Sequence, residues 1–404
     1  MQLIKRLSER MFWDELIPLM LAVYAFCIFI PRGVTALERL GLGIALLITL
    51  CGGRWRHALP YLRHSILLLL LLFVLWQGGT AAWSLDADET LSSAVSVFKD
   101  YFLILPPLLF VMSQPALRGL LFRYFAYCAL VVMLLNGGQY VQEILTDPAL
   151  LQNFKLHRGW SHPLIFFFPF VLLQWHLAAG RESPSRWFWL LALMLAILMI
   201  IATGARAAWL AILTVGAVWL TLEFNWRRFL QLAFLALCVG LVSYLTVPFV
   251  QMKVKQGLDT SGRVGGVWTA AVDMISDRPL LGYGFSKKIY NQEFLRRLDG
   301  EPHWTVRRAI GPHSNYLEIA FAGGLVGLGF LLSLYLAAIC SYIGSLRICQ
   351  RAERYWVAAP FAAFAGFYVV RGGFESVRWA PLVIPLACLV HFSWMARTAR
   401  AKAD

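Results

Sequence analysis

Long apolar runs, separated by short polar segments, recur along almost the whole chain. A helix that crosses the roughly 30 Å hydrocarbon core of a bilayer needs about 20 apolar residues, so runs near that length predict transmembrane helices. We expect about twelve of them, at approximately residues 16–30, 36–53, 65–83, 94–112, 122–143, 163–179, 187–203, 208–224, 229–250, 315–343, 356–370 and 380–395. The predicted fold is an all-α, polytopic membrane protein.

One polar segment, residues 251–314, is much longer than the others. It separates residues 1–250, with nine predicted transmembrane helices, from residues 315–404, with three. Apolar residues recur at helical spacing over Arg263–Asp277, and Pro279 then favours the end of that helix. We therefore expect a large extramembrane loop that contains helices, and a loop of this size is usually functional.

Basic residues are distributed unevenly between the two predicted sides of the membrane. If the N-terminus is cytoplasmic, the inner segments hold 18 Lys and Arg, and the short outer segments hold 6. Because basic residues accumulate in cytoplasmic loops, both termini are predicted to be cytoplasmic and residues 251–314 to face the opposite side. No small-x-small cleavage site follows the first apolar run, so we expect this run to remain as the first span.

The composition argues against several other classes of protein. Hydrophobic residues make up 59% of the chain and charged residues 14%, whereas soluble proteins have about 45–50% and roughly 25%. The net charge of +14 could indicate nucleic-acid binding. However, the basic residues lie in short loops, which is typical of membrane orientation and contact with anionic lipid. The seven cysteines form no CxxC pair, so we expect neither disulfides nor zinc ligands.

His313 stands where the long polar segment meets the next apolar run. Pro312 and Ser314 favour a helix start, which places His313 at the outer end of that helix. Because an imidazole titrates near neutral pH, it can accept a proton from a sugar hydroxyl. Gly324 and Gly327 would let a neighbouring helix or a lipid chain approach closely. The alternative is an interfacial histidine that caps a helix beside a glycine packing face.

The spacing of these residues resembles a family signature. His313 and Ser314, nine residues, Gly324, two residues and Gly327 resemble the His-[Asn/Ser/Gln]-x9-Gly-x-x-[Gly/Thr/Tyr] pattern of the bacterial O-antigen ligases. Those proteins also resemble this chain in having about twelve spans and one large periplasmic loop late in the sequence. The resemblance implies that His313 is functional.

Two arginine elements extend the resemblance. Arg206 begins the sequence RAAWL in a short turn between two apolar runs, and this resembles the family's Arg-x3-Leu element. Arg263 ends the sequence SGR, with PLLGYG at 279–284 after it, and this resembles the wider group of ligases, Wzy-type polymerases and protein O-oligosaccharyltransferases. Two guanidinium groups could hold a diphosphate through forked hydrogen bonds. Alternatively, a lone arginine extends its charge to the membrane interface.

A further outward-facing loop contains Arg371 and Glu375. It could add a cation and a carboxylate to the same site, or it could be an ordinary polar turn with an Arg–Glu pair. We treat these two residues as a possible additional part of the site.

Two patterns could suggest a metal site but are weak. Asp86 and Asp88 imitate the DxD motif of metal-dependent glycosyltransferases, in a short turn where acidic residues are common. His157 and His162 are five residues apart with no carboxylate nearby. We therefore expect no metal ligands and no cofactor.

The resemblance implies a membrane glycosyltransferase of the bacterial inner membrane with its active site facing the periplasm. It would transfer a glycan from undecaprenyl diphosphate to a sugar of lipid A–core in lipopolysaccharide biosynthesis. His313 would activate the acceptor hydroxyl, and Arg206 and Arg263 would hold the diphosphate. A diphosphate is a good leaving group, so no partner acid or metal is needed, in contrast to glycosidases. Direct attack would invert the anomeric centre. The expected partners are both substrates and membrane lipids, but no nucleic acid.

Three alternatives stay open. A Wzy-type polymerase would accept a second lipid-linked glycan, and a protein O-oligosaccharyltransferase would accept a Ser or Thr of an exported protein. A lipid or polysaccharide transporter should show a charged path on both faces, whereas this chain has one basic outer insert.

Overall fold

The computed structural model describes residues 10–30, 35–147, 156–222, 245, 251 and 263–401, and every structural statement below refers to these residues. They form helices joined mostly by short connections, with a longer one at residues 298–314, and η5 and η6 are π-helical. The elements are α2 (Arg10–Phe29), α3 (Thr35–Cys51), η1 (Arg54–Tyr61), α4 (Ser65–Gly79), η2 (Thr80–Ala82), α5 (Ala87–Phe102), α6 (Leu105–Ser113), α7 (Pro115–Thr146), η4 (Arg158–Trp160), α8 (Ser161–Gly180), α9 (Ser185–Ala202), α10 (Arg206–Leu220), η5 (Arg263–Trp268), α13 (Thr269–Asp277), α14 (Lys287–Arg297), α15 (Asn315–Ile348), α16 (Arg351–Phe364), η6 (Ala365–Arg371), α17 (Gly372–Phe374), η7 (Ala380–Leu382) and α18 (Val383–Arg400).

The predicted all-helical membrane fold is confirmed, but the predicted number of spans is not established. Within the described residues, nine helices are long and apolar enough to cross a membrane. The count is ten if α3 and η1, which are bent by 94°, form one span. The helix α10 is apolar but shorter, and the predicted span at 229–250, apart from residue 245, lies outside the described residues. Twelve spans therefore remain a prediction.

The core of the bundle is built around α8, which contacts α7, α9 and α16. Phe166, Phe167 and Phe170 of α8 are buried. The ring centroids of Phe166 and Phe29 are 5.0 Å apart, and those of Phe170 and Phe125 are 4.9 Å apart. Because lipid tails are as apolar as these side chains, close packing, more than exclusion from water, holds the helices together.

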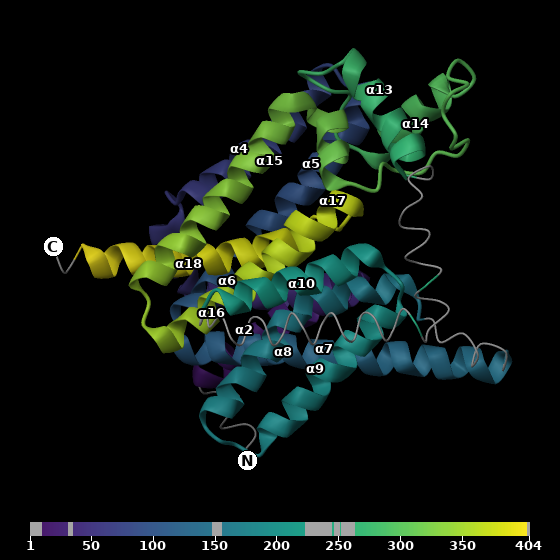
Figure 1. Ribbon diagram of the computed structural model, residues 1–404. Coiled ribbons are helices and arrows are strands. Elements are labelled where there is room, and N and C mark those ends of the chain that lie inside the picture. The colour runs from purple at the N-terminus through teal and green to yellow at the C-terminus, as the bar shows by residue number, and fades with distance from the viewer. Residues whose placement is uncertain are drawn as a thin grey trace.

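The helices α13 and α14 lie beside α15 at one end of the molecule (Figure 1). The helix predicted over Arg263–Asp277 is present as η5 and α13, and it ends two residues before Pro279. A small apolar cluster joins Met274 of α13, Phe294 of α14 and Phe321 of α15. This cluster fixes α13 and α14 to the start of a long helix.

The helix α15 is broken at Gly324, where φ is 66° and ψ is −167°. This backbone conformation is essentially restricted to glycine. The N–H of Leu325 leaves the helical ladder and donates to the carbonyl of Pro279, at 2.7 Å. A Cβ atom on Gly324 would lie 2.0 Å from the carbonyl oxygen of Leu280. The glycine is therefore required by the close approach of the 279–284 segment.

The same segment satisfies the carbonyl groups that the break sets free. The N–H of Tyr283 donates to the carbonyl of Phe321 at 2.9 Å, and that of Gly284 donates to Ala322 at 3.0 Å. In an unbroken helix these carbonyls would accept from residues one turn later. The two sequence elements PLLGYG and Gly-x-x-Gly thus form one structural unit.

Gly327 lies where α15 passes α4. A Cβ atom there would be 3.2 Å from the side-chain nitrogens of Gln77 and Trp76. Trp76 also donates from Nε1 to the carbonyl of Gly323 at 2.9 Å. The small residues of α15 therefore allow a close contact with α4.

Candidate functional site

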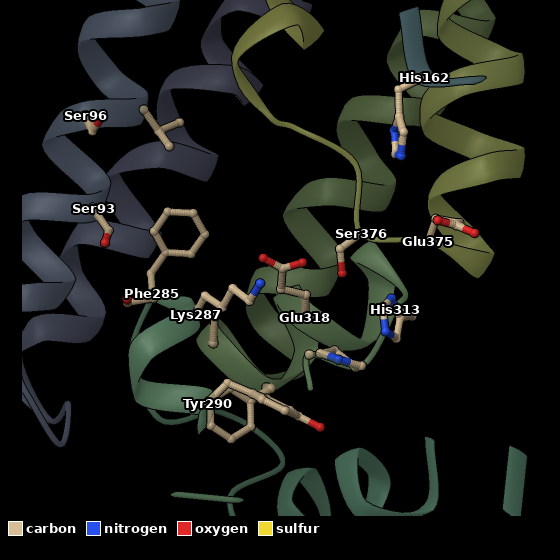
Figure 2. Close-up of a pocket in the computed structure, with 16 residues that line it drawn as sticks. Ser93, Ser96, His162, Phe285, Lys287, Tyr290, His313, Glu318, Glu375 and Ser376 are labelled. Carbon is tan, nitrogen blue, oxygen red and sulfur yellow. The ribbon is translucent and has the colours of Figure 1, made fainter. Parts of the chain in front are cut away.

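A cavity of about 510 Å³ opens at the start of α15, between α5, α8, α14 and the segment after α17 (Figure 2). The residues that line it come from five separate parts of the chain. They are Ser93, Ser96, Val97, His162, Phe285, Ser286, Lys287, Tyr290, Gly311, Pro312, His313, Glu318, Phe321, Ala322, Glu375 and Ser376.

His313 lines this cavity directly before the helix α15. Ser314 is the N-cap residue, although its side chain makes no capping hydrogen bond. Asn315 Oδ1 accepts a hydrogen bond of 2.9 Å from the N–H of Val377, which ties the start of α15 to the wall that carries Glu375. The loop before His313 and the anchored helix after it thus fix the position of the imidazole.

The backbone of His313 is in the left-handed region, with φ of 50°. This conformation is uncommon for a residue with a side chain and costs of order 1–3 kcal/mol. Such strain is concentrated at functional sites, where the surrounding structure holds it in place. The strain therefore supports a functional role for His313.

Arg371 is fully buried directly behind the cavity wall. It ends the π-helical element η6, and π-helical turns often occur at functional sites. Arg371 Nη2 is 3.9 Å from Glu375 Oε2. Among the described residues, none of its three guanidinium nitrogens has a hydrogen-bond partner. A buried cation is costly in free energy when its N–H groups lack acceptors and the nearest carboxylate is not in hydrogen-bond contact. Such a site would stabilise an anion.

A second arginine pairs with this carboxylate, and a third lies near that second one. Arg158 forms an ion pair with Glu375 through Nη2 and Oε1. Arg206 is the first residue of α10, after the turn Thr203–Ala205, and its charge acts on that of Arg158. Arg158, Arg206 and Arg371 are called the arginine cluster below. Glu375 faces two of these three cations, so the cluster has an excess of positive charge.

The structure brings together most of the residues singled out in the sequence. His313 and Glu375 line the same cavity, Arg371 lies behind Glu375, and Arg206 reaches the cluster beside Arg158. The backbone of Arg263 lies in η5, but its side chain is outside the described part of the structure, as are the two residues before it.

Sequence reasoning missed four residues at this site. His162 was considered only as a metal ligand, yet it lines the cavity. Arg158 was not singled out, yet it pairs with Glu375 of the cavity wall. Glu318 and Lys287 also line the cavity, on α15 and α14. Only Glu318 had a signal in the sequence, because it is a charged residue within an apolar run.

The described residues contain no group of three His, Cys, Asp or Glu side chains that could hold a metal ion. Asp86 instead caps α5, because its side chain accepts a hydrogen bond of 3.0 Å from the N–H of Glu89. Asp86 also lies 3.4 Å from Lys288 Nζ. The N–H of Glu89 and the charge of Lys288 hold the pKa of Asp86 below its usual value. Asp86 of the DxD-like pair thus has a structural role at the start of α5.

Comparisons with known proteins point in the same direction. Residues 191–332 match the family model described as O-Antigen ligase. The chain is 31% identical to the O-antigen ligase of Salmonella typhimurium over 235 residues, which are 56% of this chain and 57% of that protein. It is 28% identical to the O-antigen ligase of Pseudomonas aeruginosa over 142 residues, 35% of this chain and 31% of that protein.

The matched region contains Arg206, Arg263, His313, Gly324 and Gly327. The matches thus cover only part of the chain and of its relatives, but they include the elements that carried the resemblance. Over this region the chain is therefore similar to the O-antigen ligases, and it spans 57% and 31% of the length of the two relatives.

Proposed function

We propose that this protein is an O-antigen ligase: a membrane glycosyltransferase that moves a glycan from undecaprenyl diphosphate to a sugar hydroxyl of lipid A–core. The observation that carries the proposal is that His313 and Glu375 line one cavity, with Arg158 and Arg371 beside that carboxylate. A proton acceptor and an anion-binding group are the two components that this transfer requires.

In the proposed reaction, His313 takes the proton of the acceptor hydroxyl. The acceptor oxygen forms a bond to the anomeric carbon while the bond from that carbon to the diphosphate oxygen breaks. The diphosphate leaves with the electron pair, and the anomeric configuration is inverted. No metal or cofactor has a step in this reaction.

Arg158, Arg206 and Arg371 would stabilise the charge that grows on the leaving diphosphate. Guanidinium groups suit this task because they donate parallel hydrogen bonds to phosphate oxygens. Glu375 pairs with Arg158, and a diphosphate would compete with this carboxylate for the cluster. Arg263, on the extramembrane side, would contribute from η5.

The proposed orientation places both termini in the cytoplasm and this cavity at the periplasmic face of the bacterial inner membrane. The count of basic residues supports it. The site lies at the same end of α15 as the extramembrane helices α13 and α14 (Figure 1).

Lipopolysaccharide from a strain that lacks this protein tests the function. If the protein is a ligase, gel electrophoresis will show core without glycan, and lipid-linked polymer will accumulate. Core that carries one repeat unit would instead indicate a polymerase. Unchanged lipopolysaccharide with loss of glycan from exported proteins would indicate a protein O-oligosaccharyltransferase.

A further inference from the structure

The cavity has a second group of polar residues, away from the arginine cluster. Figure 2 shows Ser93 and Lys287 on one side of Glu318, and His162 and Glu375 on the other. The side with Glu375 adjoins the excess positive charge. The side with Lys287 has one cation for one carboxylate, so its charge is nearly balanced.

Glu318 lies in the first turn of α15, five residues after His313. Both side chains line the cavity. The polar neighbours of the Glu318 carboxylate are the side chains of Ser376 and Trp379 and the charge of Lys287. Among the described residues, no cation forms an ion pair with it. An ionised carboxylate has two oxygens that can each accept more than one hydrogen bond, so Glu318 keeps capacity for a ligand.

Tyr290 of α14 gives a second, independent indication. It lines the cavity, only 2% of its surface is exposed, and its hydroxyl has no hydrogen-bond partner among the described residues. Its ring packs edge-on against Phe321, with 4.9 Å between the centroids. Because buried hydroxyl groups are normally hydrogen-bonded, this group is suited to a polar ligand.

We propose that this end of the cavity binds the acceptor sugar, and that Glu318 accepts hydrogen bonds from hydroxyls beside the one that His313 deprotonates. This inference rests on the proposed function. A sugar fits because a carboxylate can accept from two neighbouring hydroxyls, while the aromatic rings of Phe285 and Tyr290 offer apolar contact. The negative charge of Glu318 disfavours the diphosphate here, so donor and acceptor enter from opposite ends.

The test is steady-state transfer by the purified full-length protein, with undecaprenyl-diphosphate glycan and lipid A–core varied separately. Since hydrogen bonds to a charged group are strong, Glu318→Ala should raise the KM for lipid A–core roughly 10- to 100-fold. The donor KM and the kcat at saturating acceptor should stay within about twofold of wild type. Glu318→Asp should restore part of the loss.

Two further variants keep the test independent of folding. Tyr290→Phe removes only the hydroxyl, and it should raise the acceptor KM by roughly 3- to 10-fold. Glu353→Ala is the matched control, because Glu353 also lies in the first turn of a long helix but does not line the cavity. It should leave both KM values unchanged.

An unchanged acceptor KM in Glu318→Ala, with an active wild type, would overturn the subsite. A lower kcat in Glu318→Ala together with a lower unfolding temperature would also overturn the subsite, because a structural role of Glu318 would explain both losses. If the wild type transfers to a lipid-linked glycan but not to lipid A–core, the ligase function fails. The acceptor KM is then measured with that glycan, and the same rise still supports the subsite. If the wild type transfers to neither acceptor, the affinities of wild type and Glu318→Ala for core oligosaccharide are compared by tryptophan fluorescence. Equal affinities would overturn the subsite.

Discussion

Replacement of the buried arginine Arg371 should separate stability from activity. Its guanidinium is 0% exposed. The nearest Glu375 oxygen is 3.9 Å away, which is beyond hydrogen-bond distance. We therefore expect Arg371→Met to leave the fold as stable as wild type or more stable. The same change should nearly abolish transfer, because it removes a donor to the diphosphate.

The magnitudes follow from the surroundings of Arg371. Burial of an ion costs several kcal/mol, and replacement of a buried charge by an apolar side chain of similar length is often neutral or stabilising by about 1–4 kcal/mol. Glu375 keeps Arg158 as its partner, so the change leaves no carboxylate unpaired. Loss of one donor to a developing anion typically lowers turnover by about 10²–10³-fold.

The assay combines thermal unfolding in nanodiscs, followed by tryptophan fluorescence, with transfer from undecaprenyl-diphosphate glycan. Added inorganic diphosphate should raise the unfolding temperature of wild type more than that of Arg371→Met. Arg63→Met, at an exposed arginine, is the control and should change neither property. A variant of Arg371 that unfolds at lower temperature but keeps full transfer would refute the reasoning, since Arg371 would then be a structural partner of Glu375.

Two other predictions concern packing and topology. Gly324→Ala would place a Cβ atom 2.0 Å from the carbonyl oxygen of Leu280 in a backbone conformation reserved for glycine. It should therefore destabilise the fold by about 3 kcal/mol or more, whereas Gly329→Ala meets open space and should be neutral in the same unfolding assay. In a background without the natural cysteines, Gly300→Cys should react with a membrane-impermeant thiol reagent on spheroplasts and Arg351→Cys should not. The opposite labelling would contradict the proposed orientation.

The apolar pattern predicts the helices well because each long run is buried in lipid or against another run. It does not reveal where a run bends. The break at Gly324 lies inside an apolar stretch, and its cause is the backbone of Pro279, 45 positions earlier in the chain. The apolar pattern also does not indicate the 94° bend between α3 and η1. Contacts of this kind cannot be deduced from periodicity.

The site was predictable only in part. His313 and Arg206 stand in short motifs, so their spacing indicated them. Arg158 and Glu375 are 217 positions apart, and nothing in their local sequence shows that they form an ion pair. Glu318 also gave little indication, since its role depends on the cavity into which α15 places it.

The central claim is that His313 removes the proton of the acceptor hydroxyl, and one measurement tests it most directly. Turnover of purified His313→Gln should be compared with wild type at saturating donor and acceptor. Glutamine keeps hydrogen bonding but cannot take the proton at neutral pH, so turnover should fall by about 10²–10⁴-fold while the donor KM stays nearly constant. His303→Gln, at a histidine that pairs with Asp273 away from the cavity, should remain active. Near-wild-type turnover of His313→Gln would contradict the account, because His313 would then only position the acceptor.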